Sequence, residues 1–519
     1  MLHPPTDLTL AGAPSTYWWE KPWFLALMIA LAAIPLLYPP IPPLVDLFGH
    51  LGRYRVALDL SHSPWLQQYF GFHWALIGNL GVDLLVMPLG RLIGLEPAVK
   101  LIVLTIPPLT VAGFLWVARE VHGRVPPTAL FALPFVCGFP FLFGFLNFAL
   151  SVALAFLAFG LWLRLGRLGM TRLRGWLFVP ISLIVFFAHT YGWGLLGLLC
   201  FSADAVRLHD KGRSWIRACI EAALHTAVMA LPILIMLAWR SETQGGETAA
   251  WFEWEWKWRW IYSALRDRWQ IFDIGSLVIA GLVFAYALVS GRLTLSRNLA
   301  FSAIVLAVSF ILLPRIVFGS AYADMRLLPY LFAVALLAIR FKQDTHQPTA
   351  RLLAWAGLAF VLVRIVSTSL SLGIAADDQG AKLAALNHVP AGARVIAFVG
   401  KRCGDDWELP RNDHLGSMVI VRRFGFSNDQ WPLAGSSLLT IRNPQAGRFA
   451  HDPSQKVRPR ACAYSEAWPI ETSLGRFPRD KFDYVWLIDP PPFDPALLKD
   501  TIRVWRGPGS ALYRLSTQP

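Results

Sequence analysis

Three residues that could do chemistry follow the first apolar segment of the chain. Asp46, His50 and Arg53 stand at positions i, i+4 and i+7, the spacing that places side chains on one face of a helix. A carboxylate, an imidazole and a guanidinium on one face can serve proton transfer beside an anion site. The competing interpretation is a solvated first helical turn, in which Asp46 only complements the helix dipole.

Five more polar residues stand at turns between later apolar segments. Arg315 and Arg326 offer cationic, fork-shaped donors suited to a phosphate, and a buried arginine needs an anionic partner. Asp324 could itself be the partner of Arg326, which would make that arginine structural. A lone intramembrane histidine is usually packed and hydrogen-bonded. His189 and Asn147 therefore indicate a functional site only together with the other polar residues on the same side. Together these residues predict a phosphate-binding pocket.

The elements that position these residues are predicted to be membrane helices. The chain has 519 residues, of which 55% are hydrophobic and only 15% charged, whereas soluble domains average about 25% charged residues. This composition excludes an ordinary soluble enzyme, a disordered chain and a disulfide-stapled secreted scaffold. No zinc-type spacing, phosphate-binding glycine loop or dinucleotide glycine pattern is present. No cofactor is therefore predicted, and a divalent metal is left open.

Apolar runs close to the roughly 20 residues that cross a bilayer predict about eleven transmembrane helices. One further candidate, 74–93, contains Asn79, Asp83, Pro88 and Arg91, which are costly in lipid unless they face protein or water. We expect this candidate to form an interfacial or re-entrant helix. The eleven predicted spans lie near 23–39, 99–118, 127–143, 146–163, 176–189, 192–206, 218–238, 274–291, 299–318, 327–339 and 352–373.

The distribution of charge predicts the direction of the chain. If 74–93 does not cross and the amino terminus is cytoplasmic, every strongly basic short connection falls on one side, as the positive-inside rule requires. The formal charge of +14 is thereby explained without nucleic acid. We expect an integral protein of a bacterial inner membrane, with its carboxyl-terminal region in the periplasm. The basic connections hold Arg119 and Arg124; Arg164, Arg167, Arg172 and Arg174; Arg207, Lys211, Arg213 and Arg217; Arg292 and Arg297; and Arg340, Lys342 and Arg351.

The chain divides into three predicted parts. Residues 1–22 form a cytoplasmic segment, 23–373 form the transmembrane domain, and 374–519 form a small extracytoplasmic α/β domain, in which charged and turn residues return. The transmembrane domain carries two long external loops, 40–98 and 239–273. Helices of the first loop are expected to lie on the outer membrane surface.

The external regions carry the remaining signals. The stretch 251–260, WFEWEWKWRW, fits an interfacial aromatic belt or a short strand, and membrane anchoring is preferred over sugar stacking. Cys403 and Cys462 face the oxidising side, where the two can form a disulfide. Short apolar runs bounded by turns predict four strands, over Arg394–Val399, Ser417–Arg422, Tyr484–Ile488 and Ala511–Leu515.

In its layout the chain resembles the GT-C superfamily of polyprenyl-phosphate-sugar glycosyltransferases, such as protein O-mannosyltransferases and the lipid A aminoarabinose transferase. The resemblance covers about residues 20–373. It consists of a first span running into PPLVDLFGH, a long external first loop, further spans and an external carboxyl-terminal domain. In that family an acidic residue early in the first external loop acts as catalytic base, and Asp46 is the matching position. This chain has one acid there instead of the commoner two, and no WWDYG-like motif.

The resemblance implies sugar transfer from a polyprenyl-phosphate donor, held among membrane lipids, to a glycan, lipid or protein acceptor outside the cytoplasm. Asp46 would take the acceptor proton in a single inverting displacement. Arg326, assisted by Arg315 or His189, would stabilise the leaving phosphate. The other residues expected at the substrate and phosphate site are His50, Arg53, Asn147 and Asp324.

Other functions use the same features. A transporter or flippase of lipid-linked saccharides would use the polar residues as a pathway, but it predicts charged or broken segments through the membrane and symmetry between halves. A polysaccharide polymerase or ligase shares the donor type and has larger external loops between later spans. A sensor acting through the carboxyl-terminal domain is the third alternative. The clustering of polar residues at one face favours the glycosyltransferase.

Overall fold

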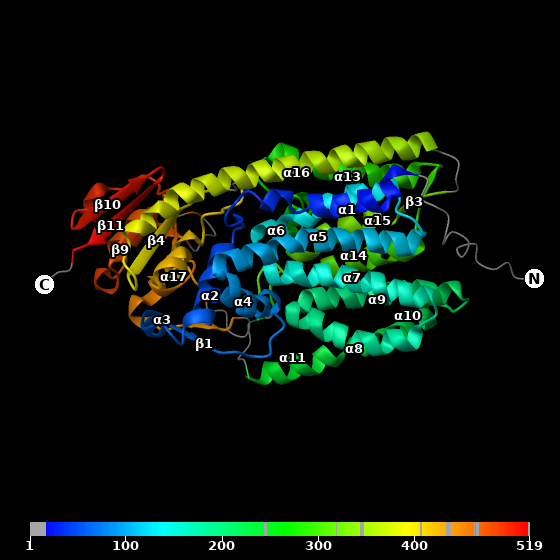
Figure 1. The fold of residues 1–519 in the computed structure, drawn as a ribbon, viewed down its shortest axis with the longest axis horizontal. Coiled ribbons are helices and arrows are strands. Elements are labelled where there is room, and N and C mark those ends of the chain that lie inside the picture. The colour runs from blue at the N-terminus through cyan, green and yellow to red at the C-terminus, as the bar shows by residue number, and fades with distance from the viewer. Residues whose placement is uncertain are drawn as a thin grey trace, which may run out of the picture.

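The computed structural model describes most of the chain. The molecule is elongated, with a helical bundle in one part and an α/β region in the other (Figure 1). The predicted amino-terminal segment 1–22 lies largely outside the described residues. The structure describes residues 17–242, 247–317, 319–342, 347–404, 407–431, 437–460, 462 and 467–516.

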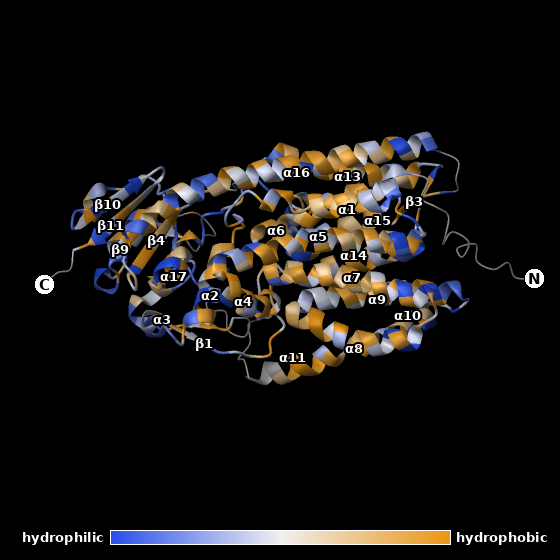
Figure 2. Ribbon diagram, in the orientation of Figure 1, coloured by the Kyte–Doolittle hydropathy of each residue, from blue (hydrophilic) through white to orange (hydrophobic). Residues whose placement is uncertain are grey.

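Apolar helices run along the length of the bundle, and hydrophobic residues dominate this part of the molecule (Figures 1 and 2). Each of the eleven predicted ranges overlaps one helix or helical segments separated by a short break, although 299–318 continues beyond the end of its helix at Leu312. The bundle elements are α1 (Pro22–Leu31), α5 (Leu95–His122), the 3-10 helix Pro127–Cys137 with α6 (Phe139–Phe143), α7 (Leu146–Arg167), α8 (Thr171–Ala188), α9 (Thr190–Asp210), α10 (Trp215–Thr226), α11 (Leu231–Glu242), α13 (Gln270–Val289), α14 (Arg297–Leu312), α15 (Leu328–Leu337) and α16 (Gln347–Leu383).

The protein is an integral membrane protein, although the structure does not establish eleven spans. Within the described residues, five helices are long and apolar enough to cross a membrane, or six if the pair α10 and α11, bent by 62°, counts as one span. Four further apolar helical segments have only 10–17 residues. An α-helix needs about 20 residues to cross the hydrocarbon core. The apolar runs therefore located the helices better than they counted the spans.

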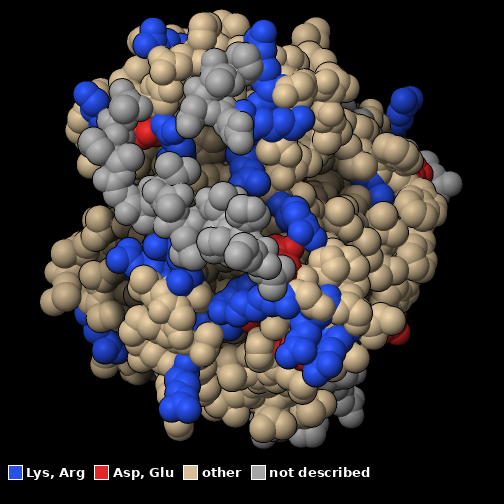
Figure 3. All heavy atoms as spheres, turned by 90° about the vertical axis from the view of Figure 1, so that its right-hand side faces the viewer, with Lys and Arg blue, Asp and Glu red and all other residues tan. Residues whose placement is uncertain are grey.

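The predicted basic connections gather at the end of the bundle that lies away from the α/β region. Contacts link them in series: Arg167 pairs with Glu120 of α5 at 2.7 Å, and Arg297 of α14 pairs with Asp210 of α9. Strand β2 (Leu293–Leu295) pairs antiparallel with β3 (Ile339–Phe341) at the same end. Figure 3 views this end and shows many Lys and Arg side chains and few acidic ones. One face of the bundle thus carries the predicted concentration of positive charge.

The segment 40–98 packs against the carboxyl-terminal domain as well as the bundle. Helix α2 (Leu47–Asp59) lies so close to that domain that a Cβ on Gly49 would come within 2.3 Å of the Trp431 ring. Gln430 donates to the Gly49 carbonyl at 2.9 Å, which fixes the same contact. The segment also forms α3 (Pro64–Tyr69), α4 (Gly81–Ile93) and β1 (Phe70–Phe72), which pairs with β6 (Leu439–Ile441).

Helix α4 occupies the ambiguous candidate 74–93. It has 13 residues and is therefore about 20 Å long, which is shorter than the hydrocarbon core of a bilayer. Its Asp83 side chain is 1% exposed and is paired with Arg53 at 2.9 Å. Asp83 therefore faces protein, whereas Pro88 and Arg91 of the same candidate are exposed.

The carboxyl-terminal domain contains one mixed sheet of described strands. Its order is β10-β11-β9-β4-β7-β8, and β5 also pairs with β4. The pairs of β4 with β5, β7 and β9 are parallel, so these strands end at one edge of the sheet. The bounds are β4 (Arg394–Gly400), β5 (Phe426–Ser427), β7 (Lys456–Arg458), β8 (Trp468–Pro469), β9 (Tyr484–Ile488), β10 (Thr501–Gly507) and β11 (Ser510–Leu515), with helices α17 (Met418–Arg423) and α18 (Ile470–Arg476) beside them.

Two sequence predictions for external segments were wrong. The predicted strand Ser417–Arg422 is helix α17, because its apolar run is buried on several sides between α2 and the sheet. A short continuous apolar run has no alternation that separates a buried strand from a buried helix. The strand alternative for 251–260 is also wrong, since Trp254–Tyr262 forms helix α12. Trp254 and Trp258 are exposed on it, as a membrane-surface helix requires.

Helix α16 joins the bundle to the carboxyl-terminal domain without a break. It has 37 residues, about 55 Å of helix, and extends past the predicted domain boundary at 373/374. Its last turns carry Asp377, Asp378 and Lys382. The helix therefore supplies polar side chains to the region where the two parts of the molecule meet.

Candidate active site

A large cavity lined by many charged side chains lies where the helical bundle meets the carboxyl-terminal domain. Its volume is about 2100 Å³. One side is formed by the start of α2, the turn between α6 and α7, α12 and the segment before α15. The other side is formed by the ends of β4 and β9, by β7 and by the loops that follow these strands. Seven of the eight predicted site residues line this cavity: Asp46, His50, Arg53, Asn147, His189, Arg315 and Arg326.

Backbone contacts fix the position of Asp46, the residue that precedes α2. Its amide donates to the Phe143 carbonyl at 2.9 Å, and the Val45 amide donates to the Leu142 carbonyl at 3.3 Å. Gly144 has φ +100°, and a Cβ there would lie 2.8 Å from the Asp46 nitrogen. Glycine is the residue that adopts this conformation without a steric penalty. The turn between α6 and α7 therefore holds Asp46 at the cavity wall.

The environment of Asp46 favours its protonated form. Its side chain is only 15% exposed, and burial raises the pKa of the carboxyl to about 8. The charges of Lys456 and Arg326 lower this pKa, whereas those of Asp452 and Asp413 raise it. Because burial is the largest influence, a substantial part of the Asp46 population is protonated at neutral pH and releases its proton as the pH rises through about 8.

His414 of the carboxyl-terminal domain faces Asp46 with a fixed tautomer. Its Nδ1 lies 2.8 Å from the Asp429 backbone carbonyl, which can only accept, so Nδ1 carries the proton. The Nε2 lone pair then points towards Asp46, 3.8 Å from Oδ1. Burial lowers the pKa of His414, which favours the neutral ring. The Trp431 ring packs against it edge-on, with centroids 4.4 Å apart.

Arg326 is a buried cation that lacks a carboxylate partner in the described part of the chain. It is 6% exposed. Its Nη2 donates to the Ser320 hydroxyl and the Ala321 carbonyl, each at 3.2 Å, and its Nε has no hydrogen-bond partner. The guanidinium lies over the Phe145 ring at 4.2 Å. Burying a guanidinium without an anion is expensive, which marks this part of the cavity as an anion site.

His189 directs a second donor at the same place. Its Nδ1 accepts from the Tyr191 amide at 3.1 Å, so the proton of the neutral ring is on Nε2. That Nε2 lies 3.3 Å from Nη1 of Arg326. Two donors that face each other are stabilised when an acceptor lies beside both of them. His189 and Arg326 together therefore offer donors to one anion.

Arg315 and Asp324 have partners that the sequence did not suggest. Arg315 pairs with Glu253 at 3.1 Å and lies over the Trp256 ring at 4.0 Å. Glu253 therefore partly neutralises the charge that Arg315 brings to the cavity. Asp324 is buried and pairs with Lys257 of α12 at 3.2 Å. The interpretation of Asp324 as the partner of Arg326 is therefore wrong, and Asp324 does not line the cavity.

Arg53 and Asn147 belong to a buried hydrogen-bond network at the cavity wall. Arg53 and Asn147 both donate to the Asp83 carboxylate at 2.9 Å. Asn147 also donates to Asn79 and accepts from the Val82 amide at 2.6 Å. These contacts fasten α4 to α2 and α7. The network occupies both polar atoms of the Asn147 side chain, whereas Arg53 contributes only Nη2 and its Nε is buried without a hydrogen-bond partner among the described residues.

His50 lies between this network and the carboxyl-terminal domain. Burial and the charge of Arg53 lower the pKa of its imidazole well below the usual value, so the ring is neutral. It packs edge-on against Trp431, with centroids 5.4 Å apart. Its Nδ1 is buried with no hydrogen-bond partner among the described residues. Asp46, His50 and Arg53 thus share one helical face, as the spacing predicted, but they contact three different environments.

Sequence reasoning missed the contribution of the carboxyl-terminal domain to this site. His414, Asp452 and Lys456 line the cavity beside Asp46, more than 360 positions away along the chain. They stand in loops and at a strand start without a recognisable spacing. Among the described residues, no group of three or more His, Cys, Asp or Glu is placed to hold a metal ion.

The sequence matches no protein-family model and no curated protein. Among solved structures, the fold is similar to that of ArnT from Cupriavidus metallidurans bound to undecaprenyl phosphate, with a TM-score of 0.48 and 10% identity over 95% of this chain and 97% of that one. The apo structure of the same ArnT gives a TM-score of 0.47 and 12% identity over 96% and 98%.

Proposed function

We propose that the protein transfers a sugar from a polyprenyl-phosphate donor to an acceptor outside the cytoplasm. The observation that carries this proposal is the opposite polarity of two histidines in one cavity. His189 presents an N–H beside the cationic Arg326, and His414 presents a lone pair beside Asp46. One place in the cavity is therefore suited to hold an anion, and another to receive a proton.

Arg326 and His189 would hold the phosphate of the donor. Phosphoryl oxygens accept hydrogen bonds from guanidinium and imidazole donors, and these donors are already oriented. When the bond between the anomeric carbon and the phosphate oxygen breaks, the negative charge that develops on the phosphate remains beside Arg326. Arg315 would add a weaker attraction because Glu253 partly neutralises it. The prenyl chain would lie among the apolar helices.

Asp46 would act on the acceptor. Its carboxylate takes the proton of the acceptor hydroxyl while the hydroxyl oxygen attacks the anomeric carbon, and one displacement inverts the configuration there. His414 would hold the protonated carboxyl through its Nε2 lone pair, and Lys456 would stabilise the carboxylate before the reaction. The raised pKa of Asp46 makes it a stronger base than an ordinary aspartate once it is ionised.

The same arrangement favours a reaction centre over a transport pathway. The unpartnered donors and the buried carboxyl lie at one end of the bundle, at the cavity, and the basic connections lie at the other (Figure 3). We infer that the cavity end faces the periplasm of the inner membrane and that the basic end is cytoplasmic.

The test separates donor binding from transfer. Arg326→Gln should weaken binding of undecaprenyl phosphate to the full chain in nanodiscs by about tenfold or more, because a charge-assisted contact is lost. Asp46→Asn should keep that binding and abolish sugar transfer from undecaprenyl-phosphate-linked pentoses and hexoses to an envelope extract. Arg297→Gln, at the opposite end of the bundle, is the matched control for the lost charge. Full transfer activity in Asp46→Asn would refute the proposed base.

A further inference from the structure

On the carboxyl-terminal side of the cavity, the described lining residues include more cations than their described acids neutralise. Three lysines line it, and each is paired. Lys382 contacts Asp378 and Asp489, Lys401 contacts Asp413, and Lys456 contacts Asp452 at 3.1 Å. These described acids are therefore already engaged by lysines. Three arginines line the same side of the cavity and are in no ion pair with a described residue: Arg402, Arg458 and Arg460.

These three arginines, the arginine wall, have no carboxylate partner among the described residues. The one hydrogen bond between their groups runs from Nη1 of Arg458 to the Arg402 carbonyl, at 3.3 Å. The Nε of Arg458 is buried without a partner. Guanidinium groups are matched to carboxylates and phosphates, with which they form paired hydrogen bonds. The wall therefore has donors available for an anionic ligand.

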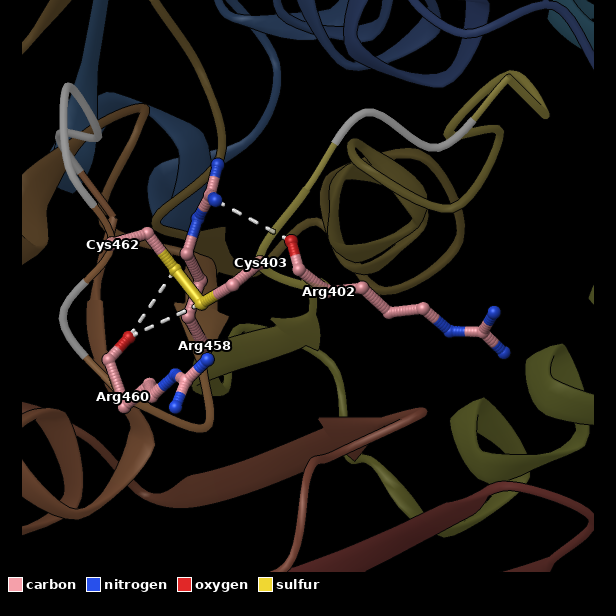
Figure 4. Close-up of a disulfide and its surroundings, with 5 residues drawn as sticks. All are labelled: Arg402, Cys403, Arg458, Arg460 and Cys462. Atoms are coloured by element: carbon pink, nitrogen blue, oxygen red, sulfur yellow. Dashed lines mark hydrogen bonds between the residues drawn. A yellow bond between two sulfur atoms is a disulfide. The ribbon is translucent and has the colours of Figure 1, made fainter.

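A disulfide fixes the loops that carry the wall. Cys403 and Cys462 are joined, with their Cα atoms 5.8 Å apart, as the sequence allowed. The bond links the loop after β4 to the loop after β7, and the Lys401 amide donates to the Val457 carbonyl at 2.7 Å. Figure 4 shows Arg402, Arg458 and Arg460 around this link. The backbone that carries these arginines is therefore held in place before a ligand arrives, which lowers the entropic cost of binding.

The position of the wall relates it to Asp46. It stands at the carboxyl edge of the parallel strands β4 and β7, the edge at which open α/β sheets bind ligands. Arg458 lies two residues beyond Lys456 on one strand, so both side chains leave the same face, roughly 7 Å apart along it. Lys456 in turn acts on the charge of Asp46. A ligand could therefore extend from Asp46 along β7 to the arginines.

We propose that the arginine wall binds an acidic oligosaccharide, which is the acceptor of the transfer reaction; this identification of the acceptor rests on the proposed function. The three side chains point in different directions (Figure 4). Guanidinium groups that point in different directions are better matched by an anion with several separated charges than by a single phosphate. A chain that carries several carboxylates at intervals can contact them together while its terminal hydroxyl lies beside Asp46.

The experiment measures binding of two fluorescent oligosaccharides to the full chain in nanodiscs of neutral lipid. The probes are hexagalacturonate, which is acidic, and maltohexaose, which is neutral. Arg458→Gln combined with Arg460→Gln should weaken hexagalacturonate binding by about tenfold or more, and added salt should weaken the wild type similarly. The matched control is Arg503→Gln combined with Arg506→Gln, which removes two exposed arginines outside the cavity. Equal binding of both probes, or an equal loss in the control, would overturn the proposal.

A second measurement on the same samples separates this inference from the donor site. Undecaprenyl phosphate should bind equally to the wild type and the Arg458/Arg460 variant, which also shows that the variant is folded. Arg326→Gln should lose undecaprenyl phosphate and keep hexagalacturonate. If undecaprenyl phosphate fails to bind the wild type, the proposed function fails, and hexagalacturonate still decides the arginine wall. If the double variant loses only undecaprenyl phosphate, the wall holds a lipid phosphate and the proposal is wrong.

Discussion

The raised pKa of Asp46 leads to a prediction that needs no knowledge of the sugar or the acceptor. The carboxyl should be protonated below pH 8 and ionised above it. With a pKa of about 8, about a tenth of the molecules carry the ionised form at pH 7, half at pH 8 and about nine tenths at pH 9. The base is therefore available in about tenfold more molecules at pH 9 than at pH 7.

Two neighbouring charges should shift this titration in opposite directions. Lys456→Gln removes a cation that lowers the pKa of Asp46, so the midpoint should rise. Asp452→Asn removes an anion that raises the pKa, so the midpoint should fall. A unit charge at roughly 10 Å and an effective dielectric constant of about 20 changes a pKa by about one unit. The midpoints of the two variants should thus differ by up to about two units.

Infrared difference spectroscopy can follow the Asp46 carboxyl directly. The carbonyl band of the protonated acid should be present in the wild type, absent in Asp46→Asn, and half lost at about pH 8. The three variants can be compared in detergent over the same pH range. A midpoint near pH 4 would refute the burial argument. Shifts of the same sign in Lys456→Gln and Asp452→Asn would refute the electrostatic assignment.

Two further predictions concern the surroundings of Asp46. His414→Asn keeps an amide donor for the Asp429 carbonyl and removes the lone pair that faces Asp46. Sugar transfer should therefore fall by roughly 10²-fold, while undecaprenyl phosphate binding stays unchanged. Wild-type transfer rates in this variant would contradict the role of His414. Arg53→Met leaves the buried Asp83 carboxylate without its cation, so thermal unfolding should show a loss of about 3–5 kcal/mol. Adding Asp83→Leu should restore most of that stability, and a further loss would contradict the ion-pair explanation.

Local sequence patterns located many of the elements. The apolar runs placed the bundle helices because a membrane helix must be apolar along its whole length. Turn-bounded runs placed β4, β9 and β11, whereas the run that became α17 was misread because full burial removes the alternation on which a strand prediction depends. Span counting was less successful, because several apolar segments are shorter than a full crossing and are broken by turns.

The candidate site illustrates the limit of such reasoning. A helical face brought Asp46, His50 and Arg53 together, since their spacing is a local property. The partners of the predicted site residues lie on other segments of the chain. Arg53 pairs with Asp83, Asp324 pairs with Lys257, and Asp46 faces His414. Each of these contacts joins segments at least 30 residues apart.

Sequence patterns alone predicted a membrane protein, the gathering of its basic connections on one face, and the position of an aspartate and several arginines at the opposite one. These properties follow from hydropathy and charge counted along the chain. The folded chain was needed to show that Arg326 lacks a carboxylate partner among the described residues and that His414 faces Asp46. Ion pairs and pKa values depend on distances of a few ångströms and on burial, and the packing of remote segments sets both.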